Sequence, residues 1–168
     1  MGLVSLPVVN SSNQLMQEQR FTTSGTWTAP TNVNKVWVSL VGGGGSGSTH
    51  TGGYTAWAGM PGGVLHQQAT VVAGTTYTIT IGAGGAPSGS NGAATTALGF
   101  TGSGGYGGQN ENTSFYDRNG NNYGSNLQDR GATSGDSSAN SGAGGGAGNY
   151  STAGGAGGSG LVILKWLS

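Results

Sequence analysis

The stretch KVWVSLVGGGGSGS, residues 35–48, decides the fold, because it joins an alternating strand directly to a run of glycines. Val36, Val38 and Leu40 fall on one face of a strand with period two, so we expect them to point into a core. The glycines that follow have no Cβ, which allows neighbouring backbones to approach closely. The chain repeats this junction in TYTITIGAGG (76–85) and, in reverse order, in GGAGGSGLVILKWL (154–167).

Further strands are predicted from β-branched and aromatic residues bounded by glycine, proline and asparagine. We expect them at 21–30, 64–73, 76–81, 94–100 and 161–167. The last is a near-continuous apolar run, which is typical of a strand buried on both faces. No stretch has the 3.6-residue period of a helix. The sequence therefore predicts an all-β fold, an antiparallel, jelly-roll-like β-sandwich.

Glycine is the dominant residue, with 38 of 168 positions, whereas only 6% of the residues are charged. It gathers in segments 42–48, 59–63, 82–92, 102–108, 142–148 and 153–160. Ordering a residue costs about 1–2 kcal/mol of backbone entropy, so such segments stay flexible unless bonds offset that cost. Two interpretations remain open: flexible linkers, or a polyglycine II bundle braced by the sandwich. Interleaving of the segments with strands favours the bundle.

Composition excludes several functions. The formal net charge is zero and Lys plus Arg total 5, too few for binding nucleic acid through its phosphates. There is no cysteine, hence no disulfide and no thiolate chemistry. No run of 18 apolar residues could span a membrane, and the start MGLVSLPVVN has no signal-peptide pattern. We expect a protein without a signal peptide or a membrane span.

Motif matches point away from catalysis. GGGGSGST (42–49) resembles a phosphate loop but has Ser48 in place of the essential lysine. The only histidines, His50 and His66, accompany no nucleophile elbow. DRNGNN (117–122) has its glycine one position too early for a calcium loop. We therefore expect no enzyme activity, no metal and no cofactor.

Residues 1–20 differ from the rest, since they are apolar and amide-rich and contain one glycine. We divide the chain into an N-terminal assembly arm (1–20) and a glycine-rich β-domain (21–168). The alternative for the arm is a frayed terminus. Its apolar residues are Leu3, Val4, Leu6, Val8 and Val9.

Aromatic residues outside the strands are candidates for contact with a receptor. Tyrosine and tryptophan among Gly, Ser and Asn are typical of binding loops, because rigid rings give contact area at low entropic cost. The alternative is that the rings fill gaps between glycine segments. The candidate binding residues are His50, Tyr54, Trp57, Tyr106, Phe115, Tyr116, Tyr123 and Tyr150.

Three blocks together resemble the glycine-rich domain of bacteriophage tail-fibre and tail-tip proteins. They are FTTSGTWTAPTNVNKVWVSLVGGGGSG, GGVLHQQATVVAGTTYTITIGAGGAP and GGAGGSGLVILKW, within residues 21–168. The chain is also similar to long-tail-fibre tip adhesins, in which polyglycine II helices stack and their loops bind receptors. It departs from those adhesins because it lacks a recognisable attachment domain of their kind.

The resemblance implies a non-catalytic virion protein, made in the host cytoplasm, that recognises a host receptor. The receptor would be either a glycan or a loop of an outer-membrane protein. Its arm would bind other tail or fibre proteins. The alternative is a purely structural virion protein, such as a head fibre or decoration protein. The sequence leaves a homotrimer and a monomer that caps a trimeric fibre equally open.

Overall fold

A computed structural model describes residues 15–49, 56–109, 135–148 and 152–168, and these residues form an all-β structure. Two four-stranded sheets have the strand orders β1-β8-β3-β4 and β2-β5-β6-β7, and every pair of neighbours is antiparallel. The strands are β1 (Met16–Phe21), β2 (Gly25–Thr28), β3 (Lys35–Val41), β4 (Val64–Thr70), β5 (Thr76–Thr80), β6 (Thr95–Ala97), β7 (Phe100–Gly102) and β8 (Leu161–Leu167). The predicted antiparallel sandwich is confirmed.

The core lies between the inner faces of the two sheets. Val36, Val38 and Leu40 of β3 are buried, as their alternation predicted. Trp27 of β2 packs on Trp166 of β8, with ring centroids 5.5 Å apart. Each such aromatic contact adds about 0.5–1.5 kcal/mol to the burial of the rings. The two tryptophans thus join the sheets through their side chains.

Three expected strands differ in detail from the observed ones. The predicted strand 21–30 is the end of β1 and all of β2, which lie in different sheets. The predicted strand 94–100 is a hairpin, because Leu98 and Gly99 both have positive φ and form a two-residue turn. β8 alternates between buried and more exposed residues, so it is buried on one face only. Of its outer residues, Leu161 and Ile163 are half-buried, whereas Lys165 and Leu167 are exposed.

The first strand begins inside the segment that we assigned to the arm. Met16–Phe21 pairs with β8 in register Met16↔Leu167, and Leu15 and Ser168 exchange backbone hydrogen bonds of 3.2 and 3.1 Å. Residues 15–20 therefore belong to the sheet. The arm residues Leu3, Val4, Leu6, Val8 and Val9 lie outside the described residues.

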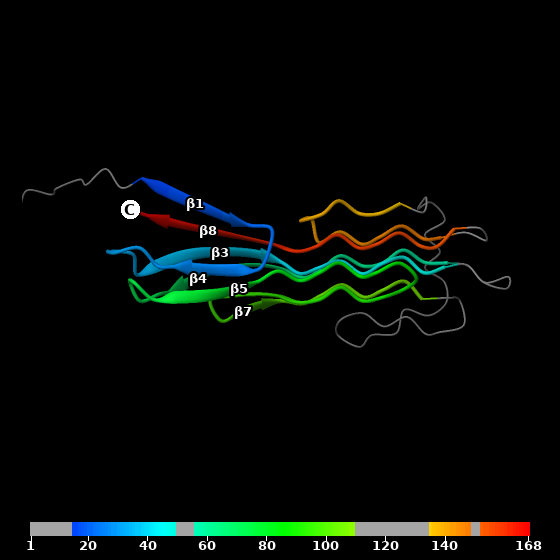
Figure 1. Ribbon diagram of the computed structural model, residues 1–168, viewed down its shortest axis with the longest axis horizontal. Helices are drawn as coiled ribbons and strands as arrows, with labels where there is room; N and C mark the ends of the chain where they lie inside the picture. The colour runs from blue at the N-terminus through cyan, green and yellow to red at the C-terminus, as the bar shows by residue number, and fades with distance from the viewer. Residues whose placement is uncertain (1–14, 50–55, 110–134, 149–151) are drawn as a thin grey trace, which may run out of the picture.

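The glycine segments continue the strands away from the sandwich (Figure 1). Segment 42–48 follows β3, 82–85 follows β5, and 153–160 leads into β8. In Figure 1 they run side by side to the right of the sheets, whereas the C-terminus lies at the opposite end of the molecule. The molecule therefore has two ends, which we call the sandwich end and the outer end.

Candidate functional site

Segment 42–48 is the centre of the glycine array, and all its residues are buried. Its N–H groups donate in three directions that repeat every third residue. Gly42, Gly45 and Ser48 donate to segment 57–63 at 3.0, 2.9 and 2.8 Å. The groups of 43 and 46 donate to 89–93, and those of 44 and 47 to 153–160. A period of three residues per turn is that of a polyproline II helix, the conformation of polyglycine II.

The carbonyl groups of the same segment accept from three other directions. Gly145 and Gly148 donate to Gly45 and Ser48, each at 2.9 Å. Residues 105 and 108 donate to 43 and 46, and residue 85 donates to 44. The central segment thus has six hydrogen-bonded neighbours. In order around it they are 57–63, 142–148, 153–160, 82–85, 89–93 and 102–109, and each is also bonded to the next.

We call these seven segments the glycine bundle. Its hydrogen bonds offset the entropic cost of ordering glycine, because almost every polar backbone group of the centre has a partner. The ordered interpretation of the glycine segments is therefore confirmed, and the linker interpretation is wrong for the described residues. Figure 1 shows the segments as wavy traces that lie alongside one another.

Close approach of backbones explains why the central residues are glycine. A Cβ at Gly45 would overlap the carbonyl of Tyr106, and one at Gly47 would overlap the carbonyl of Gly146. These neighbours are backbone atoms, which cannot turn aside as a flexible side chain could. Pro61 lies at an exposed position of segment 57–63, between two residues whose N–H groups are bonded. An outward position is where a residue without an N–H group is tolerated.

Ser46 and Ser48 are the only residues other than glycine in the central segment, and they are 0% and 4% exposed. The Ser90 N–H donates to Ser46 Oγ at 2.7 Å. The Trp57 N–H donates to Ser48 Oγ at 2.8 Å, and Ser48 Oγ donates to the carbonyl of Gln109 at 3.0 Å. Both hydroxyls thus join different segments. Our sequence reasoning missed these residues, although two serines that interrupt a glycine run were a visible signal.

The outer end of the bundle is our candidate site, because the described chain leaves the bundle there at several points. Segments 42–48, 102–109 and 142–148 each run toward this end. A turn at residues 86–89 also lies here, with Ser88 and Gly89 at positive φ. The Thr49 and Ser88 hydroxyls are hydrogen-bonded at 3.0 Å, so the turn is fastened to the end of the central segment.

Of the predicted binding residues, the structure describes two. Tyr106 lies in segment 102–109 and is 41% exposed, so its ring is available on the side of the bundle. Trp57 is half-buried at the start of segment 57–63, where its backbone bonds to Ser48. The remaining candidates, His50, Tyr54, Phe115, Tyr116, Tyr123 and Tyr150, lie outside the described residues.

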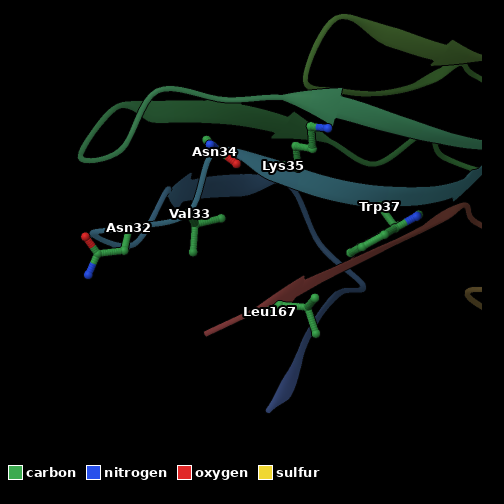
Figure 2. Close-up of a pocket in the computed structure, with 6 residues that line it drawn as sticks. All are labelled: Asn32, Val33, Asn34, Lys35, Trp37 and Leu167. Atoms are coloured by element: carbon green, nitrogen blue, oxygen red, sulfur yellow. The ribbon is translucent and has the colours of Figure 1, made fainter. Parts of the chain in front are cut away.

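A second surface lies at the sandwich end. A groove of about 200 Å³ opens between the loop that precedes β3 and the end of β8, as Figure 2 shows. Its lining residues are Asn32, Val33, Asn34, Lys35, Trp37 and Leu167. Leu15 and Met16, the first described residues, are 66% and 57% exposed; Met16 pairs with Leu167 in the sheet, and Leu15 precedes the strand. Apolar side chains exposed together are typical of contact surfaces.

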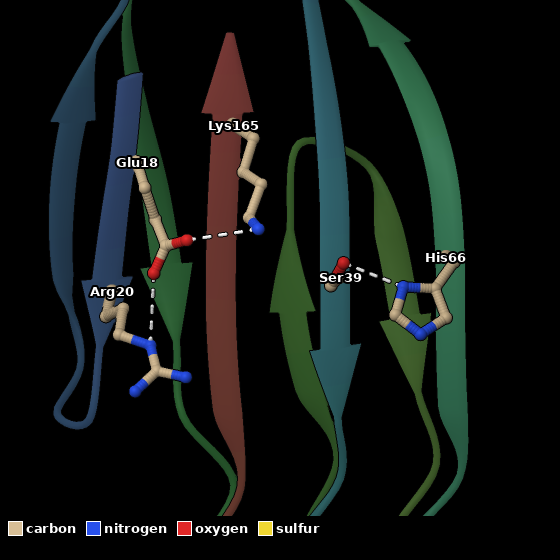
Figure 3. Close-up of polar contacts among 5 residues, drawn as sticks. All are labelled: Glu18, Arg20, Ser39, His66 and Lys165. Atoms are coloured by element: carbon tan, nitrogen blue, oxygen red, sulfur yellow. Dashed lines mark hydrogen bonds and ion pairs between the residues drawn. The ribbon is translucent and has the colours of Figure 1, made fainter. Parts of the chain in front are cut away.

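The outer face of the β1-β8-β3-β4 sheet carries polar pairs (Figure 3). Glu18 forms ion pairs with Lys165 at 3.1 Å and with Arg20 at 3.3 Å. The Ser39 hydroxyl and His66 Nδ1 are hydrogen-bonded at 2.7 Å across β3 and β4. In the sheet register Glu18 lies in the row of Lys165 and Trp37, not in that of Ser39. The serine–histidine pair therefore has no carboxylate from Glu18 to orient it as a catalytic triad requires.

The described residues hold neither a metal-binding cluster nor a membrane-spanning helix. Within 15–49, 56–109, 135–148 and 152–168, no three side chains of His, Cys, Asp or Glu lie close enough to hold a metal ion. The calcium-loop look-alike at 117–122 lies outside these ranges. No helix among the described residues is long and apolar enough to cross a membrane.

A comparison with models of protein families identifies the family of this chain. A family model described as a glycine-rich domain matches residues 20–135, more than half of the chain. The matched range includes β2 to β7 and the central segment of the bundle. No curated protein sequence matches the chain significantly. The chain belongs to this family of glycine-rich domains.

Proposed function

We propose that this glycine-rich domain protein is a bacteriophage tail-fibre or fibre-tip protein that attaches the virion to a host surface without catalysis. The observation that carries the proposal is the arrangement of the two ends. The sandwich anchors the glycine bundle, which continues from it as a hydrogen-bonded rod. At the outer end of this rod the described chain leaves the bundle after residues 49, 109 and 148. Binding residues are commonly found on loops that a rigid scaffold holds in place.

The chemistry of the bundle fits a neutral receptor. The chain has 5 basic and 5 acidic residues in all, so long-range attraction of a charged polymer is weak. Contact would rest on shape, hydrogen bonds and aromatic side chains such as the exposed Tyr106. The receptor class is a neutral host glycan or the loops of an outer-membrane protein.

The sandwich end is where we propose that other virion proteins bind. Exposed Leu167 lines the groove and exposed Met16 pairs with it in the sheet, whereas exposed Leu15 directly follows residues 1–14 in the sequence. An apolar arm that enters at an apolar surface fits assembly better than display. In this proposal the protein works in the virion, with the sandwich toward the particle and the bundle toward the host.

A structural virion protein, such as a head fibre or decoration protein, is the second candidate. The exposed apolar surface at the sandwich end supports it equally, because both functions need attachment to a particle. The two candidates differ at the outer end, which only an attachment protein uses. They also differ in the effect of removing the arm.

Two variants of the full chain separate these functions. In the first, residues 110–134 are replaced by a short Gly-Ser linker, and in the second residues 1–14 are deleted, which keeps Leu15 and β1. Attachment to the host predicts that the first variant no longer blocks adsorption of particles to cells, while the second still blocks it and is lost from particles. Equal blocking by the first variant and the intact chain would overturn the proposal.

A further inference from the structure

We propose that Ser48 is a positioning residue at the outer end of the glycine bundle. It holds the ends of three segments, at Trp57, Gln109 and Gly148, together as one rigid surface. The inference starts from the bonding of this one side chain and of its own backbone. It gives the proposed attachment function a structural cause, and rests on that function only where receptor binding is concerned. The claim about rigidity stands on the described residues alone.

The Ser48 hydroxyl joins two segments. Its Oγ accepts from the Trp57 N–H at 2.8 Å and donates to the Gln109 carbonyl at 3.0 Å. Trp57 begins one segment, two positions after residue 55, and Gln109 ends another, directly before residue 110. A single hydroxyl therefore joins the start of one segment to the end of another, although Trp57 and Gln109 lie 52 positions apart in the sequence.

The backbone of Ser48 bonds to a third segment, 142–148. Its N–H donates to the Trp57 carbonyl at 2.8 Å, and its carbonyl accepts from the Gly148 N–H at 2.9 Å. Gly148 is the last described residue before 149–151. Ser48 is thus bonded to Gln109 and Gly148, which directly precede 110–134 and 149–151, and to Trp57, which lies two positions after residue 55. With only 4% of its surface exposed, the serine is shielded from competing water.

Glycine at this position would keep the backbone bonds and lose those of the hydroxyl. Serine is tolerated here because its Cβ and Oγ fill space at the end of the central segment, whereas a Cβ at the neighbouring Gly47 would overlap a carbonyl. A buried hydroxyl needs a hydrogen-bond partner, and one segment could supply it; this hydroxyl has its donor and its acceptor on separate segments. Ser46 differs from Ser48, because its hydroxyl bonds to the N–H and the carbonyl of one residue, Ser90, beside the turn at 86–89.

The experiment compares Ser48→Ala and Ser48→Gly in the full chain with Ser103→Ala as the matched control. Ser103 lies in the same bundle, in the segment that ends at Gln109, and its backbone carbonyl accepts from Gly63. Amide hydrogen exchange under native conditions is measured residue by residue. The informative amides are Gly148 and Gly108, whose acceptors are backbone carbonyls of Ser48 and Ser46 rather than the hydroxyl that is removed. Amides of Val38 and Leu164 report on the sandwich.

We expect both Ser48 variants to speed exchange at Gly148 and Gly108 by about tenfold or more, since losing the hydroxyl leaves buried partners unpaired and loosens the end. In these variants the exchange rates of the Val38 and Leu164 amides should stay unchanged. In the Ser103→Ala control the exchange rates of all four amides should stay unchanged. Faster exchange at Trp57 alone would overturn the proposal, because the hydroxyl would then serve one local bond. A uniform rise that includes the sandwich would overturn it too, because the serine would then stabilise the whole fold.

Receptor binding is measured separately. If the attachment proposal holds, Ser48→Ala should lower the ability of the protein to block adsorption, whereas Ser103→Ala should not. Unchanged blocking together with faster exchange at Gly148 would count against the attachment function and leave the positioning role intact. The two claims therefore fail in different measurements.

Discussion

Replacing Gly45 by alanine tests the packing of the glycine bundle in the middle of its buried central segment. A Cβ at this position would overlap the backbone carbonyl of Tyr106 and press on the nitrogen of Gly107. Neither atom can move without shifting segment 102–109. The Gly45 N–H donates to Met60 and its carbonyl accepts from Gly145, each at 2.9 Å, so a shift strains bonds to two further segments.

The expected size follows from opposing effects. Overpacking a tight interior costs about 1–3 kcal/mol, and each weakened hydrogen bond costs about 0.5–1.5 kcal/mol. Alanine also lowers the conformational entropy of the unfolded chain, which stabilises the folded state by about 0.4–1 kcal/mol. We expect the free energy of unfolding to fall by about 2–5 kcal/mol, which corresponds to a Tm lowered by roughly 4–20 °C for a chain of this size.

The matched control is Gly25→Ala. Gly25 begins β2 and is exposed, and a Cβ there would meet nothing within 4 Å. Its free energy of unfolding should stay within about 1 kcal/mol of the original. Chemical denaturation followed by tryptophan fluorescence measures both variants. If Gly45→Ala were as stable as Gly25→Ala, the close packing on which the bundle rests would be refuted.

Further predictions concern the sandwich, its surface and the proposed contacts. Trp166→Ala removes the ring that packs on Trp27 and should lower the free energy of unfolding by about 3–5 kcal/mol in denaturant titration; a loss below 1 would argue against a shared core. Tyr77→Phe leaves the Val72 N–H without the hydroxyl that it donates to at 2.9 Å; because this bond is exposed, we expect a loss of about 1 kcal/mol or less, and Tm measurement decides. Glu18→Ala breaks two exposed ion pairs and should cost less than about 1 kcal/mol, a difference that should vanish in high salt. Tyr116→Ala with Tyr123→Ala should weaken blocking of adsorption with Tm unchanged, and unaltered blocking would remove these two residues from the contact surface.

The strands that were predicted well are those that carry their own pattern. β3 was expected at 35–41 and is found there, since its alternation of apolar residues fixes both the face and the length. The junctions of strands with glycine runs were also visible. By contrast, 21–30 and 94–100 each held a break that depends on tertiary context, because a short turn can lie within an apparently continuous strand.

The order in which the segments lie around the centre of the bundle could not be predicted from the sequence. Glycine segments have no side chains to distinguish one neighbour from another, so their pairing is set by the strands that anchor them and by the three-residue period of their bonds. Segment 142–148 shows this clearly, as it adjoins no strand and is placed by its bonds to 42–48. The same uniformity hid Ser48, whose importance depends on what surrounds it.

Amide hydrogen exchange of residues 42–48 is the most direct test of the central claim, that the glycine segments form an ordered bundle. These amides donate to three surrounding segments and are buried, so they should be protected about as strongly as those of β3. Exchange at the rate of an unstructured glycine chain would contradict the bundle, and with it the rigid outer end on which the proposed attachment function depends.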